Sequence, residues 1–141
     1  MTNIGELATR LQEYTSWQRT PVALSYSDYC NMIVYGIRDL YIMTGRATSY
    51  SEDMINYGPS GFPETFQGDM YVDEEEFVLV SAQMYFFQRV QTDVNNIVGY
   101  TTDALTITNA DKPYVNIQTT LQDLYDRRSM LLYKMVRYME L

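Results

Sequence analysis

The sequence predicts a mainly α-helical fold, a helical bundle of about four helices. Three observations predict it: apolar residues recur every three or four positions in four separate stretches, two of these stretches are long, and typical helix-starting and helix-ending residues bound them. A chain of 141 residues with 46% hydrophobic residues is long enough and apolar enough to bury one core. We therefore expect residues 1–141 to form a single helical domain.

The first two helices are predicted in the N-terminal third. The first has Thr2 or Asn3 as its cap and an apolar face formed by Ile4, Leu7, Ala8, Leu11 and Tyr14. The second begins at a capping box, Ser25 with Asp28, and ends before Gly45, the residue type that favours a helix C-terminus. Its apolar stripe contains Tyr29, Ile33, Ile37, Leu40 and Tyr41.

A long third helix is predicted from Asp73 to Val98, with Asp73 and Glu76 as its capping box and Gly99 after its end. Apolar residues cover so much of its circumference that we expect it to be the central, most buried helix. The acidic residues 74–76 resemble a metal cluster, but carboxylates also favour the positive end of a helix dipole, and we prefer that interpretation.

The last helix is predicted over residues 112–141, with Asp111 as its cap. Its apolar positions follow a heptad seam made of Ile117, Leu121, Leu124, Leu131, Met135 and Tyr138. A second apolar side, made of Tyr125, Leu132, Tyr133 and Met139, is too extensive for a solvated face. It indicates either a second packing partner or an intermolecular contact.

Residues 46–72 are predicted to be an extended loop or arm, because glycines and prolines interrupt any helix there. Its aromatic side chains either dock onto a neighbouring subunit or fold back over the chain's own core. Two short alternating segments, residues 21–26 and 104–108, are candidate strands of a small β-ribbon within the chain or between subunits. The residues predicted for a subunit interface are Tyr57, Phe62, Phe66, Met70, Tyr71, Leu105 and Ile107.

The residue types exclude most catalytic chemistry. There is no histidine, so Ser–His and Cys–His nucleophile systems are impossible, and the one cysteine, Cys30, cannot form an internal disulfide. We expect no enzyme activity, no cofactor and no metal, although carboxylate-only chemistry at Glu52, Asp53, Asp69 and Asp73 is a third alternative. The sequence shows no membrane span and no signal peptide, which predicts synthesis in the cytoplasm.

Charge is divided unevenly along the chain. The formal net charge is −8, and no Lys or Arg occurs between Arg46 and Arg89, whereas basic residues outnumber acidic ones in the last helix. Such a distribution suits head-to-tail contacts between copies, although it is also found on solvated faces. An acidic protein does not grip phosphate backbones, which disfavours specific nucleic-acid binding.

Three stretches carry a resemblance to a known group: D-E-E-E-F at 73–77, Y-T-T-D-A-L-T-I-T-N-A-D-K-P-Y at 100–114, and Y-K-M-V-R-Y at 133–138. The chain resembles, over residues 25–141, the head–tail connector or neck adaptor proteins of tailed bacteriophages. The resemblance lies in style, length and helix order. It implies a helical bundle that assembles as a ring, commonly twelve-fold, below the portal.

This resemblance implies a structural virion protein, made in the host cytoplasm and located in the neck of the virion. Its partners would be other copies of itself, the portal protein and the next neck or tail-completion protein, with double-stranded DNA only passing through the channel. The residues predicted to bind the portal or another partner are Tyr125, Arg127, Arg128, Tyr133, Lys134, Arg137, Tyr138 and Leu141. The alternative is a small helical regulatory or antitoxin-like protein that binds a cellular partner.

Overall fold

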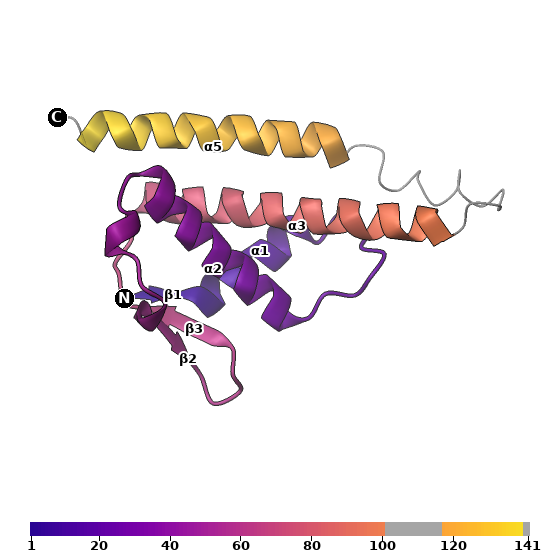
Figure 1. Cartoon of the computed structure of the whole chain (residues 1–141), viewed down its shortest axis with the longest axis horizontal. Helices are drawn as coiled ribbons and strands as arrows, with labels where there is room; N and C mark the ends of the chain where they lie inside the picture. Colours follow the sequence, from indigo (N-terminus) through magenta and orange to yellow (C-terminus); the bar gives the residue numbers. More distant parts are fainter. Residues whose placement is uncertain (101–116, 140–141) are drawn as a thin grey trace.

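The computed structural model describes residues 1–100 and 117–139, with side chains as far as residue 95 in the first range and residue 135 in the second. The described part is mainly helical, as the sequence predicts (Figure 1). Its helices are α1 (Ile4–Thr15), α2 (Tyr26–Met43), α3 (Val72–Tyr100) and α5 (Ile117–Met139). Its strands are β1 (Thr2–Asn3), β2 (Ile55–Tyr57) and β3 (Pro63–Phe66).

Helix α3 is the centre of the molecule, which confirms the prediction from its wide apolar circumference. It has α1, α2 and the small sheet on one side and the antiparallel helix α5 on the other (Figure 1). Because neighbours contact it from both sides, its middle turns are buried nearly all round, and each such side chain removes apolar surface from water. Its fully or almost fully buried apolar residues are Phe77, Val78, Leu79, Val80, Ala82, Phe86, Phe87 and Val90.

Helix ends follow the predicted chemistry at α2 but not at α3. Ser25 and Asp28 form the reciprocal capping box, and Gly45 adopts a φ of 76° just after the helix, a conformation that glycine reaches without strain. Helix α3 begins one residue earlier than predicted, and it continues through Gly99 to Tyr100 rather than ending at Val98. The carboxylate of Glu74 accepts a hydrogen bond from the Tyr71 backbone N–H (3.2 Å), so the cap precedes the predicted Asp73 box by two residues.

The segment 46–72 is more ordered than a loop or arm. It contains 3₁₀ turns at Ala47–Ser49 and Glu52–Met54, followed by strands β2 and β3, which pair as an antiparallel hairpin. Strand β1 joins the other edge of β3, giving the order β1-β3-β2. Phe66, at the end of β3, has no exposed surface and contacts the rings of Tyr41 and Tyr50 (ring centroids 5.7 and 6.4 Å apart). This part of the chain therefore folds over its own core.

The strand predicted at residues 21–26 is wrong. Residues 21–25 have no regular structure, because Ser25 caps α2 and Tyr26 is already the first residue of that helix. The partner of the hairpin is the N-terminus, where Thr2 pairs with Phe66 and Asn3 with Thr65. The other predicted strand, residues 104–108, lies outside the described residues, as does the predicted start of the last helix at 112–116.

No helix within residues 1–100 and 117–139 has both the length and the apolar character that crossing a membrane requires.

Candidate partner-binding surfaces

Helix α5 is attached to the rest of the molecule mainly through α3. Of its predicted seam, Ile117, Leu124 and Met135 are nearly inaccessible, Leu121 and Leu131 are half-buried against the core, and the side chain of Tyr138 is not among those described. Polar contacts flank the seam: Arg127 pairs with Glu76 on α3 (3.3 Å between Nη2 and Oε1). The seam and these pairs fix which face of α5 remains exposed.

Arg128 belongs to the inner side of α5. Its side chain is 13% exposed, pairs with Asp39 of α2 (3.6 Å) and lies 3.5 Å from the Ser81 hydroxyl of α3. The Tyr85 hydroxyl donates a hydrogen bond of 2.7 Å to the same Asp39 carboxylate. The structure thus places Arg128, predicted to bind a partner, in a network that joins three helices of its own chain.

The network has a clear electrostatic effect on Tyr85. Burial raises the pKa of this phenol to about 12, and the hydrogen bond to the negatively charged Asp39 adds to the increase. A hollow of about 290 Å³ beside it is lined by Asp39, Met43, Met84, Tyr85, Gln88 and Arg128. Its charged groups already satisfy one another, so we interpret this cluster as a structural connection between helices.

The outward side of α5 carries large apolar side chains. Tyr125, Met130 and Tyr133 are 52%, 65% and 68% exposed, and the neighbouring Lys134 is also exposed. We call these four residues the α5 outer face. Met130 was not predicted, although its position three residues before Tyr133 is a signal for the same helix face. The side chains of Arg137 and Tyr138 are not among those described, and Leu141 lies outside the described residues.

The predicted subunit-interface residues are divided between surface and core. Tyr57 and Tyr71 are exposed (58% and 82%), and Phe62 and Met70 are half-buried. Phe66 is completely buried, which corrects its prediction as an interface residue, because a side chain inside the core offers no surface to another subunit. Leu105 and Ile107 lie outside the described residues.

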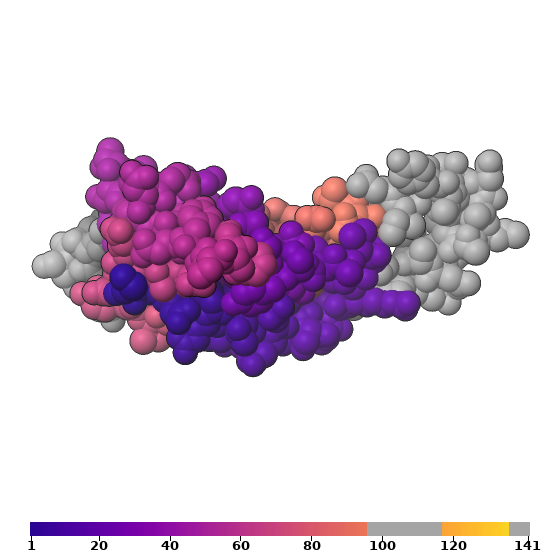
Figure 2. Space-filling view, turned by 90° about the horizontal axis from the view of Figure 1, so that it is seen from below, coloured from indigo at the N-terminus to yellow at the C-terminus, as the bar shows by residue number. Residues whose placement is uncertain are grey.

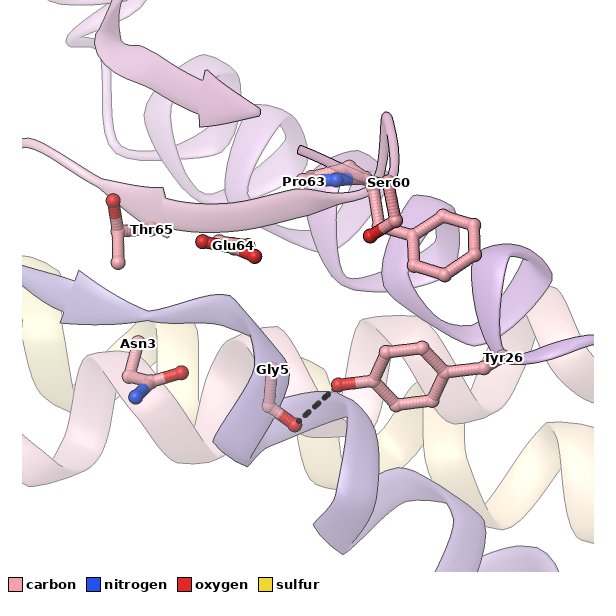
Figure 3. Close-up of a pocket in the computed structure, with 8 residues that line it drawn as sticks. Asn3, Gly5, Tyr26, Ser60, Pro63, Glu64 and Thr65 are labelled. Atoms are coloured by element: carbon pink, nitrogen blue, oxygen red, sulfur yellow. Dashed lines mark hydrogen bonds between the residues drawn. The ribbon is translucent and has the colours of Figure 1, made fainter. Parts of the chain in front are cut away.

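A second hollow, of about 380 Å³, lies between the hairpin and the first turn of α1 (Figure 3). We call it the hairpin hollow; its lining residues are Asn3, Gly5, Tyr26, Ser60, Phe62, Pro63, Glu64 and Thr65. The Tyr26 hydroxyl donates a 3.3 Å hydrogen bond to the Gly5 carbonyl, and its ring meets the Phe62 ring edge-on, with centroids 5.9 Å apart. Burial is the main cause that raises the Tyr26 pKa.

Glu64 is the one acidic side chain in this lining. The Glu64 carboxylate lies where a side chain on Gly58 would stand, since a Cβ on Gly58 would overlap its Oε1 atom. Within the described part of the chain no cation pairs with Glu64. Sequence reasoning missed this hollow because its residues come from positions far apart in the chain, brought together by the pairing of β1 with β3.

The loop between α1 and α2 presents an exposed tryptophan. Trp17 is 64% exposed, although one side of its ring contacts Phe87 (centroids 5.4 Å apart). Arg19, two residues later, is exposed as well.

Cys30 is fully buried, and burial raises the pKa of its thiol, as expected for a cysteine that serves as a small core residue.

The carboxylates proposed for the alternative catalytic role are dispersed. Glu52 pairs with Arg38 (2.9 Å), and Asp69 pairs with the amino group of Met1. Among the residues that the structure describes, no three Cys, Asp or Glu side chains are grouped so that they could hold a metal ion.

Comparisons of the chain with protein families, curated proteins and solved structures found no match.

Proposed function

We propose that this chain is a structural adaptor of the head–tail junction of a tailed bacteriophage. Copies of the chain form a ring below the portal of the DNA-filled head, with twelve subunits by analogy with the proteins that the chain resembles. The ring binds the portal on one side and the next neck or tail-completion protein on the other. DNA passes through its channel, and the protein is a component of the virion neck.

The observation that carries this proposal is the α5 outer face. Tyr125, Met130 and Tyr133 are large and exposed on a helix that lies at the edge of the bundle, and the Tyr125 ring lies 5.9 Å from the Arg128 guanidinium of the same helix (Figure 1). Aromatic and methionine side chains are enriched at protein interfaces, where they bury much surface and lose little conformational entropy. We therefore assign the portal contact to this face.

A test of this assignment must leave the inner side of α5 intact. Deleting residues 127–141 is unsuitable, because it also removes Arg128 and the buried Met135 and thereby uncovers α3. Tyr125→Ser combined with Tyr133→Ser changes two exposed positions, and thermal unfolding verifies that loss of the Tyr125 contact with Arg128 (5.9 Å) leaves the chain folded. We expect this double variant to fold normally and to co-sediment with assembled portal complexes of the same phage much more weakly than the unmodified chain.

The matched control is Tyr71→Ser combined with Val72→Ser, which removes two large exposed side chains (82% and 81%) outside α5. It should bind portal complexes as the unmodified chain does. Equal portal binding by both double variants would contradict the assigned face. A soluble one-to-one or two-to-two complex with a cellular protein, together with absence from purified virions, would instead support the regulatory alternative.

A further inference from the structure

Almost all arginines whose side chains the structure describes form ion pairs within the chain. Of those whose side chains the structure describes, each pairs with a carboxylate of the same chain except Arg19; the paired ones are Arg10, Arg38, Arg46, Arg89, Arg127 and Arg128. Arg19 stands exposed in the α1–α2 loop, two residues after the exposed Trp17. Tryptophan and arginine are the residue types that most often contribute strongly to protein–protein binding.

The hairpin hollow has the complementary character. It offers the Glu64 carboxylate beside two aromatic rings, Tyr26 and Phe62, in a space of about 380 Å³. A guanidinium group fits such a site well, because it is planar, stacks on aromatic rings and donates paired hydrogen bonds to a carboxylate. On the neighbouring strand, Tyr57 is the pairing partner of the lining residue Pro63 and is 58% exposed.

The projecting part of the α1–α2 loop and the hairpin lie apart on one face of the molecule, although the loop ends at Ser25, beside the hollow. In Figure 2 the hairpin is the magenta region, and the violet chain between α1 and α2 projects at the other end of the described surface. A contact between two different patches of identical subunits is head-to-tail, and it closes into a ring when the rotation between subunits allows it. This is the type of interface that a ring adaptor needs.

We propose that Arg19 of one copy of this chain enters the hairpin hollow of a second copy and pairs there with Glu64. The inference rests on the proposed ring and names its subunit contact. Charge complementarity favours a second copy as the occupant, since this chain supplies both a cation and an anion that no group in the described structure neutralises. Trp17 of the entering loop is covered in the same contact.

Charge reversal tests this contact directly. Arg19→Glu and Glu64→Arg should each weaken self-association by roughly 10-fold or more, the effect of losing a charge-assisted hydrogen bond. The double variant, in which the two charges are exchanged, should restore most of it. The measurement is sedimentation velocity of the full chain over a range of concentrations, with thermal unfolding to verify that each variant is folded.

The matched controls are Arg89→Glu on α3 and Asp123→Arg on α5, which make the same charge changes at exposed positions outside the proposed contacts, and they should leave self-association unchanged. The inference is overturned if the single reversals have no effect, if the double variant is no better than either single one, or if the unmodified chain stays monomeric at every concentration. None of these results bears on portal binding, which the tyrosine variants of α5 decide separately. If Glu64→Arg fails to fold, Glu64→Gln provides the same readout.

Discussion

Phe66 is the residue that shows most clearly that residues 46–72 pack against the chain's own core. Its ring packs in a cluster with those of Tyr41 of α2 and Tyr50 of the preceding loop, which also contact each other, and none of its surface is exposed. In the sequence it is an aromatic residue in a glycine- and proline-rich stretch. Such a residue is found both in arms that dock onto another subunit and in loops that pack on their own core. Its burial indicates that the hairpin is held down by the chain's own core.

Replacing Phe66 with alanine should therefore destabilise the isolated chain. We expect Phe66→Ala to lower the free energy of unfolding by about 3–5 kcal/mol, because a large buried ring is lost and a cavity remains. Urea denaturation measures this. Tyr57→Ala, an exposed change in the same hairpin, should alter the free energy by less than about 0.5 kcal/mol. Similar small effects for both would mean that Phe66 is not a core residue in solution.

Tyr85 should make the free energy of unfolding decrease at alkaline pH. Its pKa is raised from 10.0 to about 12, so the folded state favours the neutral phenol. This stabilisation is complete below pH 10 and is lost as the pH rises to 12. Between these values the unmodified chain should lose about 1–2 kcal/mol more stability than Tyr85→Phe, after allowance for solvent screening of this partly exposed group. Urea denaturation at several pH values checks it, and parallel losses would contradict it.

At the scale of elements, the packing of α2 on α3 depends on one glycine. A Cβ on Gly36 would stand 2.7 Å from the Val78 carbonyl oxygen and 3.1 Å from Val78 Cγ1, so an added methyl group would push the two helices apart. The contact involves backbone atoms, which cannot rotate away. Close approach of these helices is what buries Val78 and the residues around it.

Gly36→Ala should therefore destabilise the protein, although alanine is the better helix former. We expect a net loss of about 1–3 kcal/mol in thermal or urea unfolding, because overpacking outweighs the gain of about 1 kcal/mol in helix propensity. Asn31→Ala, at an exposed position of the same helix, gains propensity without a steric conflict and should be neutral or slightly stabilising. A stabilised Gly36→Ala variant would show that the helices can separate at little cost.

Helices were predictable where local chemistry determines them, and the sheet was not. Ser25 with Asp28, Gly45 and the apolar circumference of α3 act within a few residues, so their pattern is visible in the sequence. Strand β1 is only two residues long and forms because Thr2 meets Phe66, a pairing without any local signal. The cap of α3 was misplaced because Glu74, not Glu76, reaches back to the preceding backbone.

The sequence indicated which kinds of residue could bind a partner, but not which of them are exposed on the folded chain. Tyr125 and Tyr133 were identified from excess apolar surface on the last helix, and both are exposed. Arg128 was predicted to bind a partner as well, but its side chain lies on the inner side of α5, where it pairs with Asp39 of α2. The hairpin hollow could not be inferred at all, because it depends on how the N-terminus and the hairpin meet in space.

For the whole molecule, the net charge of −8 determines its behaviour towards DNA. The chain should show no binding to duplex DNA in about 100 mM salt, because it has no surplus of cations to replace the condensed counterions. Fluorescence anisotropy with a labelled duplex measures this. Binding that weakens steeply with added salt would reveal a concealed basic surface and would contradict a channel through which DNA slides freely.

The three consecutive glutamates at the start of α3 reach three different parts of the chain. Glu74 pairs with Arg46 after α2, Glu75 with Arg10 of α1 and Glu76 with Arg127 of α5. All three partners are remote in sequence, so these pairs can form only after the other helices have gathered around this turn. We therefore predict that these pairs form late in folding and that removing one of them chiefly raises the unfolding rate, which stopped-flow unfolding measures.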